Sequence, residues 1–184
     1  ETRRGALEGK FKDFLEECVK NEKFNKLAPR TELTEKRYEG FEMVSRFFAY
    51  SDGYKKDFED YNGSVTQYID KYIEDKNKEC QKDDSIIKEY EKKFENMLNY
   101  AEKILGAQGF RKTISSKSTP RARFEALSVG ISAALENNPQ LKICDVSDWI
   151  NGEEFATHTR SDAANNKNRL VGRIRYVKEK LLGE

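Results

Sequence analysis

Apolar residues recur every three or four positions along almost the whole chain, which is the spacing of amphipathic helices. Residues 141–144 form the one candidate strand, and they are too few to carry a sheet. The pattern therefore predicts an all-α fold, an irregular bundle of six or seven helices. The apolar stripes cover residues 6–19, 38–48, 65–73, 86–105, 124–135, 146–150 and 170–181.

The breaks between the stripes carry the residues expected at helix ends. Asn62-Gly63-Ser64 precedes one helix, Asp83 or Asp84 caps the next, and Gly106 ends it. The charged stretch from residue 75 to residue 84 predicts a loop between two halves that share one core. We therefore expect a single helical domain over residues 1–184.

The chain starts at Glu1, with no initiator Met and no capping residue directly before its first apolar stripe. A helix normally has Ser, Thr, Asp or Asn just ahead of it to accept its first free amides. We expect that cap upstream of Glu1, which would make these 184 residues a fragment of a longer protein.

Composition limits the classes of protein to which the chain can belong. Apolar and charged residues each make up 36%, and aromatic residues at 11% are enough to build a core. No apolar run approaches the roughly 20 residues that cross a bilayer, so no membrane partner is expected. Three widely spaced cysteines are typical of reduced thiols in a cytoplasmic protein.

The net charge is only +1, but the basic residues gather in the C-terminal half. Residues 111–123 hold five bases and no acid, and residues 155–184 hold seven bases against three acids. This distribution favours an anionic partner for the C-terminal half. The alternative is an ordinary solvated surface of a charged helical protein.

Two segments are candidates for binding phosphate or nucleic acid. In the first, residues 111–123, hydroxyl groups and bases precede a helix N-terminus, where free amides favour an anion. In the second, the last helix, bases on one side could follow a nucleic-acid backbone. The alternatives are a mobile linker and a plain amphipathic surface helix. The candidate residues are Arg111, Lys112, Lys117, Arg121, Arg123, Lys167, Arg169 and Arg173.

No catalytic constellation is visible in the sequence. His158 is the one histidine and sits in a polar stretch, so neither paired-histidine nuclease chemistry nor a zinc site is supported. The sequence contains neither the glycine-rich loop motifs of nucleotide-binding folds nor the nucleophilic serine elbow of hydrolases. We expect no catalytic residue, no metal and no cofactor in this chain.

Several ordered segments resemble landmarks of the family typified by the GmrS half of GmrSD, a modification-dependent restriction enzyme. The resemblance spans essentially the whole chain, although no single segment decides it. Its segments are Glu1-x-Arg3-Arg4-x-Ala6-Leu7-x-Gly9-x-Phe11, Arg46-Phe47-Phe48-Ala49-Tyr50, Gly109-Phe110-Arg111-Lys112, the run from Arg123 to Gly130, and Asn166-Lys167-Asn168-Arg169-Leu170-Val171-x-Arg173-Ile174.

The resemblance implies a helical domain without its catalytic neighbours. Family members carry an N-terminal domain of ParB/sulfiredoxin-like fold, with a D-G-Q-Q-R-type motif that is associated with nucleotide binding and hydrolysis. Many also end in, or partner with, an HNH-type nuclease. Neither the D-G-Q-Q-R-type motif nor the HNH histidines occur here. No catalytic residue of the family can therefore be placed at any position of this sequence.

The leading hypothesis is a non-catalytic helical module of a GmrSD-like phage-defence protein. It would contact DNA, or couple the missing NTPase-like domain to a nuclease domain or subunit, within an NTP-dependent restriction endonuclease. One alternative is a pure scaffold that docks the N-terminal domain or a partner subunit. Another is one wall of a shared enzyme site, with Arg111, Arg121 or Arg123 touching phosphate.

Overall fold

The computed structural model describes residues 7–35, 38–160, 162 and 164–184, and these residues form ten α-helices, six of them long, and no strand. The predicted all-α bundle is confirmed. The helices are α2 (Lys10–Lys20), α3 (Glu22–Leu27), α4 (Glu32–Glu35), α5 (Glu39–Lys55), α6 (Val65–Lys82), α7 (Ser85–Leu105), α8 (Arg121–Asn137), α9 (Ser147–Ile150), α10 (Glu153–His158) and α11 (Lys167–Leu182), with a 3-10 turn, η1 (Gly106–Gln108), after α7.

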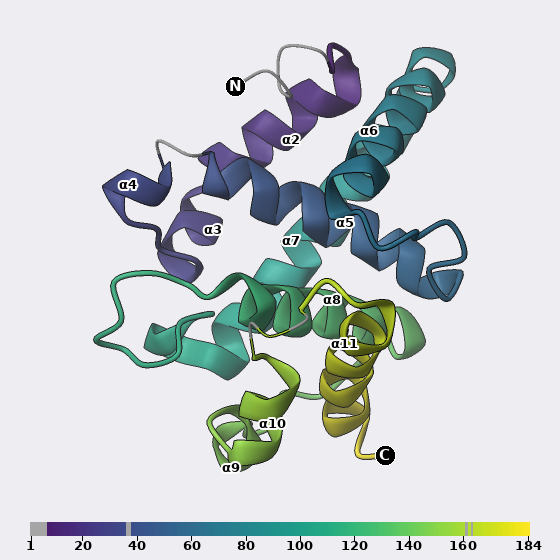
Figure 1. Ribbon diagram of the computed structural model, residues 1–184. Helices are drawn as coiled ribbons and strands as arrows, with labels where there is room; N and C mark the ends of the chain where they lie inside the picture. Colours follow the sequence, from purple (N-terminus) through teal and green to yellow (C-terminus); the bar gives the residue numbers. More distant parts are fainter. Residues whose placement is uncertain (1–6, 36–37, 161, 163) are drawn as a thin grey trace.

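Helix α8 lies at the centre of the bundle (Figure 1). It packs against α5 and α7 of the N-terminal half and against α11, while α2 packs on α5 and α6. Both α5 and α8 are buried along most of their length, which explains why their sequences lack a polar face. The short helices α9 and α10 extend the bundle beside α11.

Most predicted helix ends agree with the structure. The Ser64 hydroxyl accepts the amide of Gln67 at the start of α6, and the Asp83 carboxylate accepts the amide of Ser85 at the start of α7. Gly106 ends α7 with φ +52°, a conformation that glycine adopts without strain. These ends depend on local contacts, which is why the sequence was sufficient to place them.

The predicted loop at residues 75–84 is wrong, because α6 continues through it to Lys82. Its exposed face is densely charged, but Ile73, Asn77 and Cys80 remain on the buried face. Neighbouring helices supply the partner for that face, and a charged outer surface does not break a helix. The break is confined to residues 83–84.

The first helix of the described residues, α2, has its opening amides satisfied by a residue distant in the sequence. The side-chain carbonyl of Asn77 accepts the amides of Phe11 (3.0 Å) and Lys12 (3.1 Å), and its amide donates to the Glu8 carbonyl. Asn77 therefore satisfies the start of α2 across 66 positions of sequence. The expected cap upstream of Glu1 concerns the start of the chain, and residues 1–6 lie outside the described residues, so it stays a prediction.

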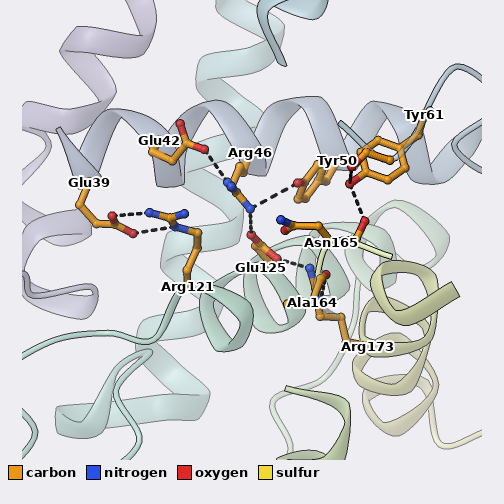
Figure 2. Close-up of polar contacts among 11 residues, drawn as sticks. Glu39, Glu42, Arg46, Tyr50, Tyr61, Arg121, Glu125, Ala164, Asn165 and Arg173 are labelled. Atoms are coloured by element: carbon orange, nitrogen blue, oxygen red, sulfur yellow. Dashed lines mark hydrogen bonds and ion pairs between the residues drawn. The ribbon is translucent and has the colours of Figure 1, made fainter. Parts of the chain in front are cut away.

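A buried ion-pair network joins α5, α8 and α11 (Figure 2). Glu125 is 2% exposed and accepts from Arg46 at 2.7 Å and from Arg173, which is 1% exposed. Arg46 also donates to Glu42 at 2.8 Å, and Arg173 donates to the Ala164 carbonyl at 2.7 Å. Two guanidinium groups thus meet two carboxylates, so the core carries a balanced set of charges.

A second polar cluster lies between α5, α6 and α7. The Asp52 carboxylate accepts from the Tyr72 hydroxyl at 2.8 Å, from the Tyr90 hydroxyl and from the Lys93 ammonium at 3.1 Å. Burial alone would raise the pKa of Asp52, but the charge of Lys93 and the two tyrosine hydroxyls outweigh it and lower that pKa.

This cluster predicts a loss of stability in acid. Because the pKa of Asp52 is lower in the folded chain than its ordinary 3.8, the carboxylate stabilises the fold above that value. The contribution is lost as the pH falls from about 4 through the folded-state pKa. In urea unfolding, the difference between the wild type and Asp52→Asn should therefore shrink as the pH is lowered from 6 to 3. Asp148→Asn, at an exposed position, is the control; a difference that stays constant with pH would contradict the assignment.

Candidate anion-binding cleft

A cleft of about 1100 Å³ opens between the loop that follows η1, the start of α8 and the α9–α10 segment. Three basic side chains and several hydroxyl groups line it, together with an apolar wall. None of its lining residues, among the parts of the chain that the structure describes, is an aspartate or a glutamate. The lining consists of Gln108, Lys112, Thr113, Ile114, Ser115, Pro120, Arg123, Ile150, Asn151, Gly152, Ala156, Thr159 and Arg160.

The loop that forms one wall is fixed by Arg111. Its guanidinium donates to the carbonyls of Gln108 (3.0 Å), Ile114 (2.8 Å) and Ala107. The loop is anchored to the rest of the bundle where the Phe110 amide donates to the Leu27 carbonyl at 2.8 Å. Arg111 therefore positions the wall, with its donors engaged by backbone carbonyls.

Arg123 is the buried cation of the cleft. Its side chain is held by the Ile150 carbonyl (2.8 Å) and the Asn151 side-chain oxygen (3.2 Å), and it lies over the ring of Phe155. The residue is only 5% exposed, and its Nε has no hydrogen-bond acceptor. No Asp or Glu among the described residues forms an ion pair with Arg123.

Burial lowers the pKa of Arg123 to about 10, because desolvation disfavours its charged form. The group stays protonated at neutral pH, so the fold holds an uncompensated positive charge at this position. The side-chain oxygen of Asn151 also accepts a hydrogen bond from Gln108 at 3.1 Å. Asn151 therefore connects the Arg123 guanidinium to Gln108 on the opposite wall. The result is a fixed cation in a recess that an anion could neutralise.

The N-terminus of α8 adds to the positive potential. Pro120 is its N-cap residue and lines the cleft, no side chain caps the first turn, and that turn contains no acid. The first amides of a helix carry partial positive charge and favour an anion. Lys112 and Arg160 are exposed and complete the basic lining.

The structure separates the bases predicted in residues 111–123. Lys112 and Arg123 meet in the cleft, and Arg111 supports its wall. Arg121 points away and forms a two-pronged ion pair with Glu39, at 2.8 and 2.5 Å (Figure 2). Lys117 is exposed on the loop but does not line the cleft.

The bases predicted on the last helix do not form one exposed face. The Nζ atom of Lys167 lies 3.5 Å from a carboxylate oxygen of Asp57, with which it forms an ion pair, and Arg169 is exposed. The placement of Arg173 on an exposed face is wrong, because it is buried against Glu125. It stands three positions after Leu170 and four before Val177, and this spacing sets it on the inward side of α11.

Sequence reasoning missed Gln108, Asn151 and Arg160 as members of the site. Gln108 and Asn151 are ordinary polar residues far apart in the sequence, and only tertiary packing brings them to Arg123. Arg160 belongs to the basic excess of the C-terminal segment, which was the one signal that could have indicated it.

His158, the one histidine of the sequence, is the last residue of α10. Its ring packs against the ring of Tyr176, with 4.7 Å between the ring centroids. Across the described ranges, no group of three His, Cys, Asp or Glu side chains is placed to hold a metal ion. The same residues contain no helix with the length and apolar character that would cross a membrane.

A comparison of this chain with protein-family models, with curated protein sequences and with solved structures finds no match. The resemblance to GmrSD-like proteins therefore stays a prediction from the sequence.

Proposed function

We propose that this chain is a non-catalytic helical module that contacts nucleic acid through phosphate groups, with the cleft around Arg123 as the contact. The observation that carries the proposal is the buried guanidinium of Arg123, which has an unpaired Nε and no carboxylate partner among the described residues. A buried cation without a counter-ion lowers the free energy of unfolding. A phosphate ligand would offset that cost and would also meet Lys112 and Arg160.

The proposal follows the resemblance to GmrSD-like proteins. In a protein of that kind, the module would contact DNA, or couple a nucleotide-hydrolysing N-terminal domain to an HNH-type nuclease. These wider roles, and the partners that they require, rest on the resemblance. The proposed contact rests on the cleft.

We expect the chain to bind labelled single-stranded DNA in fluorescence anisotropy, with an affinity that falls steeply as salt is raised. Arg123→Met should weaken binding by about tenfold and reduce the slope of log K against log salt by about one, because one phosphate contact is removed. Lys112→Met should act in the same direction, and its exposed position leaves the fold intact.

The matched control is Arg175→Met, which removes the same charge from an exposed position on α11 outside the cleft. Its affinity should stay close to that of the wild type, with circular dichroism confirming that all variants are folded. Absence of binding at low salt would overturn the proposal. Equal loss in Arg175→Met and Arg123→Met would also do so, since it would indicate a diffuse charge effect.

The scaffold alternative lacks a specific observation in its favour. The large apolar side chains exposed in the described part of the chain are Leu33, Tyr38, Ile114 and Ile143. None of them lies on α2, the N-terminal helix of the described residues.

A further inference from the structure

The position of Arg123 restricts the kind of phosphate that can reach it. Its side chain is almost fully buried, while Lys112 and Arg160 are exposed. A phosphodiester within a duplex is flanked by sugars on both sides and lies on the outer surface of the double helix. A terminal phosphate projects beyond its sugar, so it can enter a recess and meet a buried guanidinium.

The charge of the cleft also fits a terminal phosphate. Arg123, Lys112 and Arg160 supply three positive charges, and the described lining holds no acid. An internal phosphodiester carries one negative charge, whereas a phosphomonoester carries about −1.5 to −2 at pH 7. The doubly ionised group neutralises more of the charge, and it offers three oxygens to the surrounding donors.

An apolar wall lies beside the cations. Ile114 is 64% exposed, and Ile150, Ala156 and Pro120 line the same cleft. A phosphate ion alone would make no use of this wall, but the sugar and base of a nucleotide would cover it. The volume of about 1100 Å³ is ample for a nucleotide.

From these three observations we infer that the cleft recognises a terminal phosphate together with its nucleoside, at the end of a strand or in a free mononucleotide. The inference rests on the proposed function and narrows it from phosphate contact in general to one kind of phosphate. The phosphate meets Arg123 at the α8 N-terminus, and the nucleoside packs on Ile114.

The test compares single-stranded oligonucleotides of one sequence that end in a 5′-phosphate, a 3′-phosphate or hydroxyl groups only. A terminal phosphate should raise affinity for the 184-residue chain by about tenfold, and Arg123→Met should abolish that gain. Lys112→Met should reduce the gain without removing it. Arg175→Met should keep the gain and serves as the control.

Adenosine 5′-monophosphate and inorganic phosphate, used as competitors, distinguish a free nucleotide from a strand end. Ile114→Ser should weaken competition by the mononucleotide and leave inorganic phosphate unaffected, because only the nucleoside covers that wall. A mononucleotide that competes supports recognition of the free nucleotide. Competition by phosphorylated oligonucleotides alone supports recognition of a strand end.

The two proposals fail in different ways. If all three oligonucleotides bind equally and Arg123→Met still weakens them, the terminal-phosphate inference is overturned and the proposed nucleic-acid contact stands. If the mononucleotide binds and no oligonucleotide does, the nucleic-acid contact is overturned and the terminal-phosphate inference stands. If nothing binds, both are overturned.

Discussion

Replacing Glu125 by glutamine is expected to lower the free energy of unfolding by about 3–5 kcal/mol. Glu125 is the carboxylate that holds Arg46 and Arg173 together in the core, and all three side chains are buried. Burial alone would lower the pKa of Arg46, but the charge of Glu125, with Tyr50 and Glu42, outweighs burial and holds that pKa above its ordinary value. Without this carboxylate, two guanidinium groups would face each other with only Glu42 to balance them. Urea unfolding at neutral pH measures the loss.

Two controls separate charge balance from packing. Glu102→Gln breaks solvent-accessible pairs with Lys23 and Lys26, and it should change the free energy of unfolding far less than Glu125→Gln does. The triple replacement Arg46→Met, Glu125→Leu and Arg173→Met removes all three charges at once, and it should recover most of the stability that Glu125→Gln loses. A triple variant that is less stable than Glu125→Gln would show that the pairs themselves, rather than an unbalanced charge, hold the core.

Replacing Gly130 by alanine is expected to destabilise the bundle by about 1–3 kcal/mol, although alanine is the better helix former. Gly130 lies where α8 meets α11, and an added Cβ would stand 2.6 Å from the side chain of Val177 and 3.1 Å from the Ile174 carbonyl. Backbone and a β-branched side chain cannot move aside without shifting α11. Thermal and urea unfolding of the variant measure the effect.

Gly172→Ala is the matched control, because it is the same substitution in the interior of the partner helix. An added Cβ at Gly172 meets nothing closer than the His158 ring, at 3.8 Å. This variant should gain up to about 1 kcal/mol from helix propensity. If both alanine variants are equally stable, close contact between α8 and α11 is not what requires glycine at position 130.

Three of the segments behind the GmrSD resemblance contribute buried residues to the core of this structure. Arg46, Glu125 and Arg173, which form the buried network, come from three of them, and Gly130 closes one. The physical role that the structure gives these residues is to join α5, α8 and α11. Within these three segments, Arg123 is buried and has no carboxylate partner among the described residues.

The sequence by itself determined the helical class and most helix ends. An amphipathic period and a local cap such as Ser64 are set by residues within one turn of each other, so they can be recognised without tertiary information. It also indicated the basic segment 111–123, which includes Lys112 in the loop and Arg123 in α8.

Only the tertiary structure decided which charges are available to a ligand. Arg173, Arg121 and Arg123 look alike in the sequence, yet the first is neutralised by Glu125 in the core and the second by Glu39 at the surface. Arg123 alone of the three is buried beside a cleft without a carboxylate. The sequence shows that each arginine carries a positive charge. The carboxylate that neutralises it lies on a helix distant in the sequence, so only the fold shows whether that partner is present. Packing therefore decided that Arg123, of these three arginines, is the one that has no carboxylate partner among the described residues.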